Sequence, residues 1–135
     1  MARYGMEVTL QGSMEQVKGR VVEALKAQGF GILTEIDVQK ALKEKIGVDF
    51  EAYLILGACN PSLAHRALSA ERSIGLLLPC NVVLRSAGDA VEVSILDPEA
   101  MFEVVEPKTR SVLAGLPKEA KTQLQKALDA LRSKG

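Results

Sequence analysis

The chain has 135 residues, a length typical of one domain, and 47% of its residues are hydrophobic. Its 17 basic side chains are matched by 17 acidic ones, so it lacks the basic surplus of a nucleic-acid-binding protein, and we expect no nucleic-acid partner. The longest apolar stretch, Ile74 to Leu84, is interrupted by Pro79 and Asn81 and is shorter than the roughly 20 residues that span a bilayer, so we expect no membrane partner.

Three strands are predicted in the first half of the chain, because apolar side chains recur there at every second position. The third of them becomes more apolar toward its end, which is typical of a central strand that is buried on both faces. These strands are predicted over residues 3–10, 30–38 and 50–59.

Two helices are predicted between these strands from the signals at their ends. Ser13 and Gln16 have the spacing of a capping box, and Gly29 can end the first helix in a left-handed conformation. Asp37 is placed to cap the second helix and Gly47 to end it. The two helices are predicted over residues 13–28 and 38–46.

The second half of the chain contains two copies of a motif that starts helices, an N-cap residue followed by proline. Asn60-Pro61 and Asp97-Pro98 each combine a favoured N-cap residue with a favoured first helical residue. They predict a helix over 61–70 and a short helix over 99–104. The other predictions here are an extended segment over 74–78, strands over 82–85 and 90–96 joined by a hairpin turn at 86–89, a connection over 107–116 and a helix over 117–132.

This element order predicts one α+β domain over residues 1–135. A strand, a helix and a strand come first, further strands follow, and a helix ends the chain, so we expect a mostly antiparallel sheet with helices on one face. The high apolar content exceeds what one small core is expected to hide, which favours a homodimer. The N-terminus lacks a charged segment followed by a hydrophobic one, so we expect a cytoplasmic protein with reduced thiols.

Two apolar runs carry both cysteines, and each cysteine is followed directly by asparagine. The first run ends in Cys59-Asn60-Pro61 and the second contains Pro79-Cys80-Asn81. We therefore take Cys59, Asn60, Pro61, Cys80 and Asn81 as the candidate binding or thiol site.

The motifs around these residues resemble those of the bacterial domain-of-unknown-function family 302. They are Gly57-Ala58-Cys59-Asn60-Pro61 with Leu63-Ala64, then Leu78-Pro79-Cys80-Asn81-Val82, then Asp97-Pro98 with Met101. The resemblance extends from the first strand to about Val105, so residues 1–105 form the family-like part, and residues 106–135 form a connection and the C-terminal helix. It implies a fold like that of the TATA-binding protein and dimeric assembly, but no established activity. DNA binding does not follow from such a fold, because it depends on a basic surface and wedge residues.

Each cysteine has a chemical and a structural interpretation. Cys59 precedes the start of a helix, which would favour its thiolate, or it is a small apolar side chain packed in the core. Cys80 is a partner for Cys59 in a thiol pair or a metal site, or part of a bend between two extended segments. His65 would complete a set of only three soft ligands with Cys59 and Cys80, whereas a structural zinc site has four, so we expect no metal site.

Three functional hypotheses remain open. The first, which we favour, is a non-enzymatic homodimeric module that binds a protein or a small, mostly apolar molecule beside the two asparagines. The second is a thiol-based redox or sensor protein that uses Cys59 and Cys80. The third is a metal or haem carrier built on Cys59, His65 and Cys80. The chain has no catalytic constellation and no phosphate-binding glycine loop, so we expect no enzyme, and no cofactor is identified.

Overall fold

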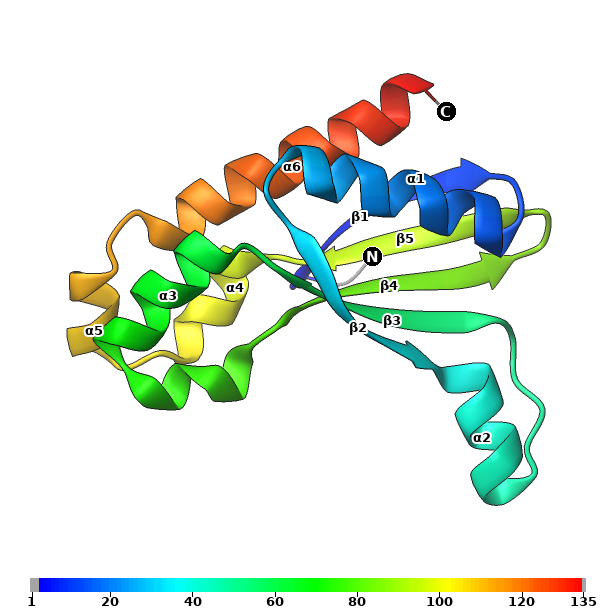
Figure 1. The fold of residues 1–135 in the computed structure, drawn as a ribbon, viewed down its shortest axis with the longest axis horizontal. Coiled ribbons are helices and arrows are strands. Elements are labelled where there is room, and N and C mark those ends of the chain that lie inside the picture. The colour runs from blue at the N-terminus through cyan, green and yellow to red at the C-terminus, as the bar shows by residue number, and fades with distance from the viewer. Residues whose placement is uncertain (1–2, 135) are drawn as a thin grey trace.

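The computed structural model describes residues 3–134 and contains a five-stranded sheet in the order β1-β5-β4-β3-β2 (Figure 1). All four neighbouring pairs are antiparallel. In this strand order β1 and β2, which are joined through one helix, lie at opposite edges of the sheet. The strands are β1 (Gly5–Gln11), β2 (Gly31–Asp37), β3 (Tyr53–Cys59), β4 (Cys80–Ala87) and β5 (Ala90–Leu96).

Two long helices cover one face of the sheet, and the shorter helices gather at its two ends (Figure 1). The covering helices are α1 (Met14–Ala27) and α6 (Leu116–Lys134). A group of short helices lies at one end of the sheet, and α2 (Val38–Ile46) projects from the other end. The short helices of the group are α3 (Pro61–Ala70), η1 (Arg72–Leu77), α4 (Pro98–Met101), η2 (Phe102–Val104) and α5 (Pro107–Val112). The predicted α+β class with a mostly antiparallel sheet is confirmed.

The helix ends follow the predicted capping chemistry. The hydroxyl of Ser13 accepts a hydrogen bond from the backbone N–H of Gln16 at 3.2 Å, and the Gln16 side chain accepts one from the Ser13 N–H at 3.0 Å. The Asp37 carboxylate accepts a bond from the N–H of Lys40 at 2.9 Å and so caps α2. Gly47 ends α2 with a φ of 68°, in the left-handed region that favours glycine.

The core lies between the sheet and the two covering helices. Alternate residues of the central strands point into it, and Leu56 and Val82 are completely buried. From α1 come Val17, Val21 and Leu25, all fully buried as their helical spacing predicts. The predicted apolar face of α6 is likewise buried and consists of Ala120, Leu124, Ala127, Leu128 and Leu131.

Two predictions in the second half of the chain are wrong. Residues 74–77 are not extended, because residues 72–77 form the 3-10 helix η1. Leu78, whose N–H bonds to the carbonyl of Gly75 at the end of this helix, has the predicted extended backbone. The connection predicted over 107–116 contains α5, which begins with Pro107 at its first position. Both segments are short and bury few side chains, so their periodicity is weak in the sequence.

No helix among residues 3–134 combines the length and apolar character needed to cross a membrane.

Candidate functional site

The two Cys-Asn corners are neighbours in the sheet. In the register of β3 and β4, the Cα of Ala58 lies opposite that of Cys80, so Cys59 is one residue from the partner of Cys80. β3 ends at Cys59 and β4 begins at Cys80, which brings both corners to the same end of the sheet. The sequence alone could not establish this adjacency.

Gly57 allows the two chain segments to approach closely at this end. A Cβ atom built on Gly57 would lie 2.7 Å from Cγ of Pro79 and would also collide with the Thr34 hydroxyl. The Leu78–Pro79 peptide bond is cis. The short distance to Cγ shows that Pro79 packs over the backbone of β3, where only glycine fits beneath it.

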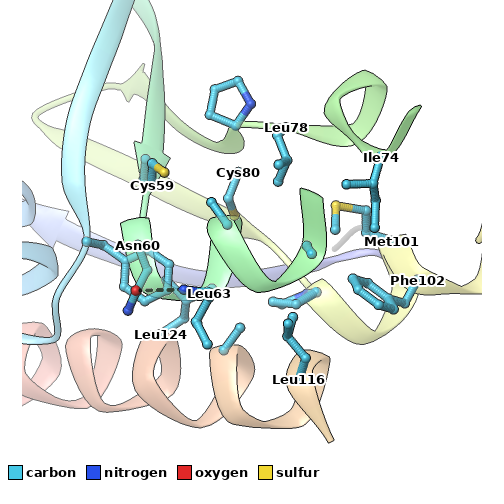
Figure 2. Close-up of a pocket in the computed structure, with 17 residues that line it drawn as sticks. Cys59, Asn60, Leu63, Ile74, Leu78, Cys80, Met101, Phe102, Leu116 and Leu124 are labelled. Atoms are coloured by element: carbon cyan, nitrogen blue, oxygen red, sulfur yellow. Dashed lines mark hydrogen bonds between the residues drawn. The ribbon is translucent and has the colours of Figure 1, made fainter. Parts of the chain in front are cut away.

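A cavity of about 70 Å³ lies between this end of the sheet and the short helices (Figure 2). One water molecule needs roughly 10–15 Å³, so the cavity has room for a small molecule of several heavy atoms. Its walls are almost entirely apolar, and none of the side chains that line it is charged. The lining residues are Phe30, Ala58, Cys59, Asn60, Leu63, Ala64, Ala67, Ile74, Leu78, Pro79, Cys80, Pro98, Met101, Phe102, Leu116, Ala120 and Leu124.

Ion pairs outside the cavity connect its walls. The Arg66 guanidinium on α3 lies 2.9 Å from the Glu119 carboxylate on α6. The Lys121 ammonium on α6 lies 2.9 Å from Asp97, which caps α4. The hydrogen bond to Asp97, and then that to Glu99 at 3.2 Å, raise the pKa of Lys121 above its usual value, so the ammonium form is favoured. The cavity is thus an apolar space between elements that are held by polar contacts at the surface.

A second polar contact connects η1 with α5. The Thr109 hydroxyl donates to Glu71 at 2.5 Å, and the Ser73 hydroxyl donates to the same carboxylate at 2.6 Å. The bond from Ser73, and then that from Thr109, hold the pKa of Glu71 below its usual value. Both hydroxyls therefore favour the ionised carboxylate that joins these short helices.

Asn60 is the one amide side chain of the candidate site that lines the cavity, and its polar atoms have structural partners. Its Oδ1 accepts from the backbone N–H of Leu63 at 3.2 Å and caps α3, as the sequence predicts. Its Nδ2 donates to Oε1 of Gln123 on α6 at 3.1 Å. Asn60 therefore fixes the cavity wall, and a ligand could use its amide only by replacing these bonds.

The structure separates the other two residues of the candidate site from the cavity. Pro61 is exposed at the first turn of α3, and Asn81 is exposed on β4. Asn81 lies opposite Gly57 in the register, on the sheet face away from the two covering helices. The cavity therefore unites Cys59, Asn60 and Cys80, but not Pro61 or Asn81.

Burial disfavours the charged form of both thiols. Burial raises the pKa of Cys80 to about 12 and raises that of Cys59 as well. The Cys80 thiol lies 3.7 Å from the Leu96 carbonyl oxygen, to which it donates. Of the two interpretations of Cys59, the raised pKa favours the small packed side chain over the acidic thiol, because burial disfavours the thiolate.

The proposed soft ligand set does not come together. His65 is exposed on the outer side of α3 and does not line the cavity. Across residues 3–134, no three side chains of His, Cys, Asp or Glu lie close enough to hold a metal ion. The arrangement therefore gives the metal or haem hypothesis no ligand set.

Larger hollows on the surface have a different chemistry. A groove of about 630 Å³ between α1 and α6 is lined by the charged residues Glu15, Arg20 and Glu23, by two glutamines, and by small or apolar residues. A second hollow of about 380 Å³ lies along α6 and is lined mainly by charged and polar side chains. Ligand pockets are usually concave and apolar with a few polar groups, which describes the cavity beside the cysteines better than these grooves.

Sequence reasoning missed most of the cavity wall. Ile74 and Leu78 belong to a segment that was interpreted as extended, and Leu116 to a segment that was interpreted as a connection. Met101 stands in the third quoted motif, three residues after Pro98, and this spacing was the available signal that the segment packs beside the cysteines.

Comparisons with known proteins identify one family, both by sequence and by structure. The family model described as "Domain of unknown function DUF302" matches residues 6–131. The chain is also similar to a solved structure, the uncharacterized conserved protein DUF302 from Bacillus stearothermophilus, with 28% sequence identity and a TM-score of 0.77. That match covers 93% of this chain and 99% of the other. No curated protein matches the chain.

Proposed function

Because this chain belongs to the DUF302 family, whose description states no activity, we propose a function from the cavity itself: a homodimeric module that binds a small, uncharged, apolar molecule. The single observation that carries the proposal is the apolar cavity between the Cys-Asn corners and the short helices. Packed cores contain few voids larger than a water molecule, so a space of about 70 Å³ at the end of the sheet is unusual for a purely structural region.

The wall chemistry supports an uncharged ligand. Side chains such as Leu63, Phe102 and Leu124 offer only apolar contacts, and the Asn60 amide already has two hydrogen-bond partners. A ligand carboxylate or ammonium group would lose its water without gaining a partner, which is strongly unfavourable. A compact hydrocarbon or aromatic group has no such hydration to lose and so would not pay this cost.

The thiols support binding rather than redox chemistry. Thiolates are the reactive form of cysteine, and burial keeps both side chains protonated at neutral pH. Cys59 and Cys80 then act as soft, weakly polar parts of the cavity wall. We also propose that the protein works in the cytoplasm, where both free cysteines stay reduced.

The homodimer is supported by large apolar side chains that remain at the surface. Leu33 is 67% exposed, Ile36 is 52% exposed and Ile46 is 68% exposed. Exposed apolar side chains that gather in patches usually mark interaction surfaces, and closed dimers are the commonest assembly of soluble proteins.

Binding is best tested with a matched pair of probes, toluene and benzoate, which differ by a methyl group in place of a carboxylate. We expect toluene to shift the NMR signals of the Leu63 and Met101 methyl groups, and benzoate at the same concentration to leave them unchanged. The variant Ala64→Leu places a larger side chain in the cavity wall and should abolish the toluene shifts. Ala70→Leu makes the same change at an exposed position of the same helix and should preserve them.

The proposal fails if toluene leaves the cavity signals unchanged at millimolar concentration. It also fails if Ala64→Leu, shown to be folded by its spectrum, binds toluene as the unmodified protein does. Equal shifts with benzoate would mean that the site is not selective for uncharged molecules.

A further inference from the structure

The sheet has one face that the two covering helices do not reach. Within residues 3–134, α1 and α6 pack on the face that carries Leu56 and Val82, and the opposite face carries the intervening residues of each strand. On this outer face, Ile36, Ile55 and Val83 are Cα partners across β2, β3 and β4. They form an apolar row that runs inward from the β2 edge, and the edge residue Ile36 is 52% exposed.

Two aromatic residues extend this apolar row at the start of β3. The rings of Phe50 and Tyr53 are tilted against each other with their centroids 6.0 Å apart. Phe50 is nevertheless 42% exposed. We call these five residues, Ile36, Phe50, Tyr53, Ile55 and Val83, the outer patch.

Helix α2 has an apolar stripe that its own chain covers only in part, since Val38, Ala41 and Leu42 are half-buried and Ile46 is exposed. Val38, Ala41, Leu42 and Ile46 follow the spacing of one helical face, yet α2 contains no buried residue. Ile46 is 68% exposed, and Val48 just after the helix is 44% exposed. A helix stripe of this kind is stable in water when it packs on another apolar surface.

Within one chain, α2 reaches the edge of the outer patch at Phe50, whose backbone carbonyl accepts a hydrogen bond from the Gln39 side chain at 3.0 Å. α2 follows β2 directly and projects beyond the ends of the strands, so it does not fold back over the sheet (Figure 1). One surface is a partly exposed sheet face and the other is a partly exposed helix stripe, and each is the kind of element that covers the other. A second copy of the chain offers both at once.

The charges of the two surfaces are of opposite sign. Residues 38–50 carry three lysines against Glu44 and Asp49, which leaves one positive charge. On the outer face, Arg85 is paired with Glu92 at 2.7 Å and with Glu51 at 3.5 Å, so its single positive charge is exceeded by the carboxylates around it. Opposite signs favour the encounter of these surfaces and disfavour pairing of like surfaces, such as α2 with α2.

We propose that α2 of one copy packs its apolar stripe on the outer patch of a second copy, and that the second copy does the same in return. This inference rests on the proposed homodimer and names its interface. The reciprocal contact gives a closed two-fold dimer, because the two contacts are identical and use up both surfaces of each chain. The exposed group Leu76, Val104 and Val112 lies on η1, η2 and α5 and takes no part.

The first test compares three variants by light scattering after gel filtration. Ile46→Asp places a carboxylate in the stripe, and Ile36→Lys places an ammonium group in the outer patch. Each should raise the dimer dissociation constant at least about 30-fold, because a charge would be buried without a partner in both contacts. Val112→Asp is the matched control, since Val112 is 69% exposed and Ile46 is 68% exposed, and its dimer should be unchanged.

Mixing the two weakened variants tests the reciprocal geometry. A mixed dimer would contain one unmodified contact and one contact in which Asp at position 46 meets Lys at position 36. Each variant alone has two damaged contacts. We therefore expect native mass spectrometry of the mixture to show the mixed dimer in large excess over either homodimer.

The outcomes separate this inference from the proposed function. If the unmodified protein is monomeric, both the interface and the homodimer are wrong, and ligand binding is judged by its own test. If the unmodified protein is dimeric and Ile46→Asp stays dimeric, or Val112→Asp becomes monomeric, only the interface is wrong. A mixture without the mixed dimer would also overturn the reciprocal contact.

Discussion

The two ends of the sheet differ in how far their apolar side chains are covered by the rest of the chain. At the end that carries the cysteines, apolar side chains from β3, β4 and the short helices face one another around the cavity. At the opposite end, the end of β2 and α2 carry apolar side chains of the same types, but Ile36 and Ile46 remain more than half exposed. The difference lies in the neighbouring elements of the chain, since within residues 3–134 the short helices α3, η1, α4, η2 and α5 lie at one end and α2 projects from the other (Figure 1).

Apolar periodicity in a sequence shows that a segment has an apolar face to be covered. It does not show which other segment, or which other chain, covers that face. Alternation predicted β2 and β3 equally well. Only the structure shows that β3 is covered on its inner face by its own chain, while β2 is exposed along almost its whole length.

Truncating one apolar side chain at each end of the sheet should give the largest difference in stability between the two ends. Leu124 is completely buried beside the cavity, so Leu124→Ala should lower the free energy of unfolding by about 2–5 kcal/mol. Ile46→Ala, at 68% exposure, should change the stability of the monomer by less than about 0.5 kcal/mol. Urea unfolding at low protein concentration measures both, and equal losses would contradict the contrast between the two ends.

Alkaline pH should weaken the cavity end through its thiols. The pKa of Cys80 is raised from 9.0 to about 12 in the folded chain, so its contribution to stability is complete below pH 9 and is lost as the pH rises toward 12. Between pH 9 and 10.5 the unmodified protein should lose about 1.5–2 kcal/mol more than Cys80→Ala, at ~1.4 kcal/mol for each unit of pKa difference. Parallel pH profiles for the two proteins would show that Cys80 is not desolvated.

Adding one methyl group beneath Pro79 tests how tightly the two corners approach. Gly57→Ala should destabilise the fold by about 1–3 kcal/mol, because the new Cβ would overlap the proline ring and the Thr34 side chain. Gly19→Ala is a suitable control, since a Cβ on this exposed helical glycine meets no atom within 4 Å. It should be neutral or stabilising in thermal unfolding, because alanine is the better helix former. Equal effects of the two substitutions would exclude a close approach at Gly57.

Removing the cap of α3 should have the smallest effect. Asn60→Ala loses the bond to the Leu63 N–H and the bond to Gln123, which together should cost about 1–2 kcal/mol. Asn60→Asp retains the cap acceptor and loses the donor to Gln123, so its cost should be smaller in the same chemical denaturation experiment. An unchanged stability for Asn60→Ala would mean that the wall of the cavity does not depend on this side chain.

The elements with strong local signals could be predicted from the sequence. The capping box at Ser13, the Asn60-Pro61 start of α3 and the apolar face of α6 all lie where the local chemistry places them. The family resemblance was equally readable, because its motifs occur in order with their spacing. The helices η1 and α5 were missed, since six-residue segments carry too few turns to show a period.

The candidate site was predictable in its position but not in its extent. The repeated Cys-Asn dipeptide identified Cys59, Asn60 and Cys80, which line the cavity, but it also drew in Asn81, which points to the other face of the sheet. The effect of burial on both thiols was not readable either, because desolvation depends on the short helices that close over them. The repeated Cys-Asn dipeptide marks the end of β3 and the start of β4. The shape of the cavity depends instead on how segments distant in the sequence pack together.

The most direct measurement of the central claim is the occupancy of the cavity by an inert apolar atom. Diffraction from crystals held under xenon pressure should show a xenon peak among Ala58, Leu63 and Phe102, because dry apolar cavities bind xenon. A cavity that remains empty under pressure, or that contains water bound to polar atoms in its place, would contradict a site for uncharged apolar molecules.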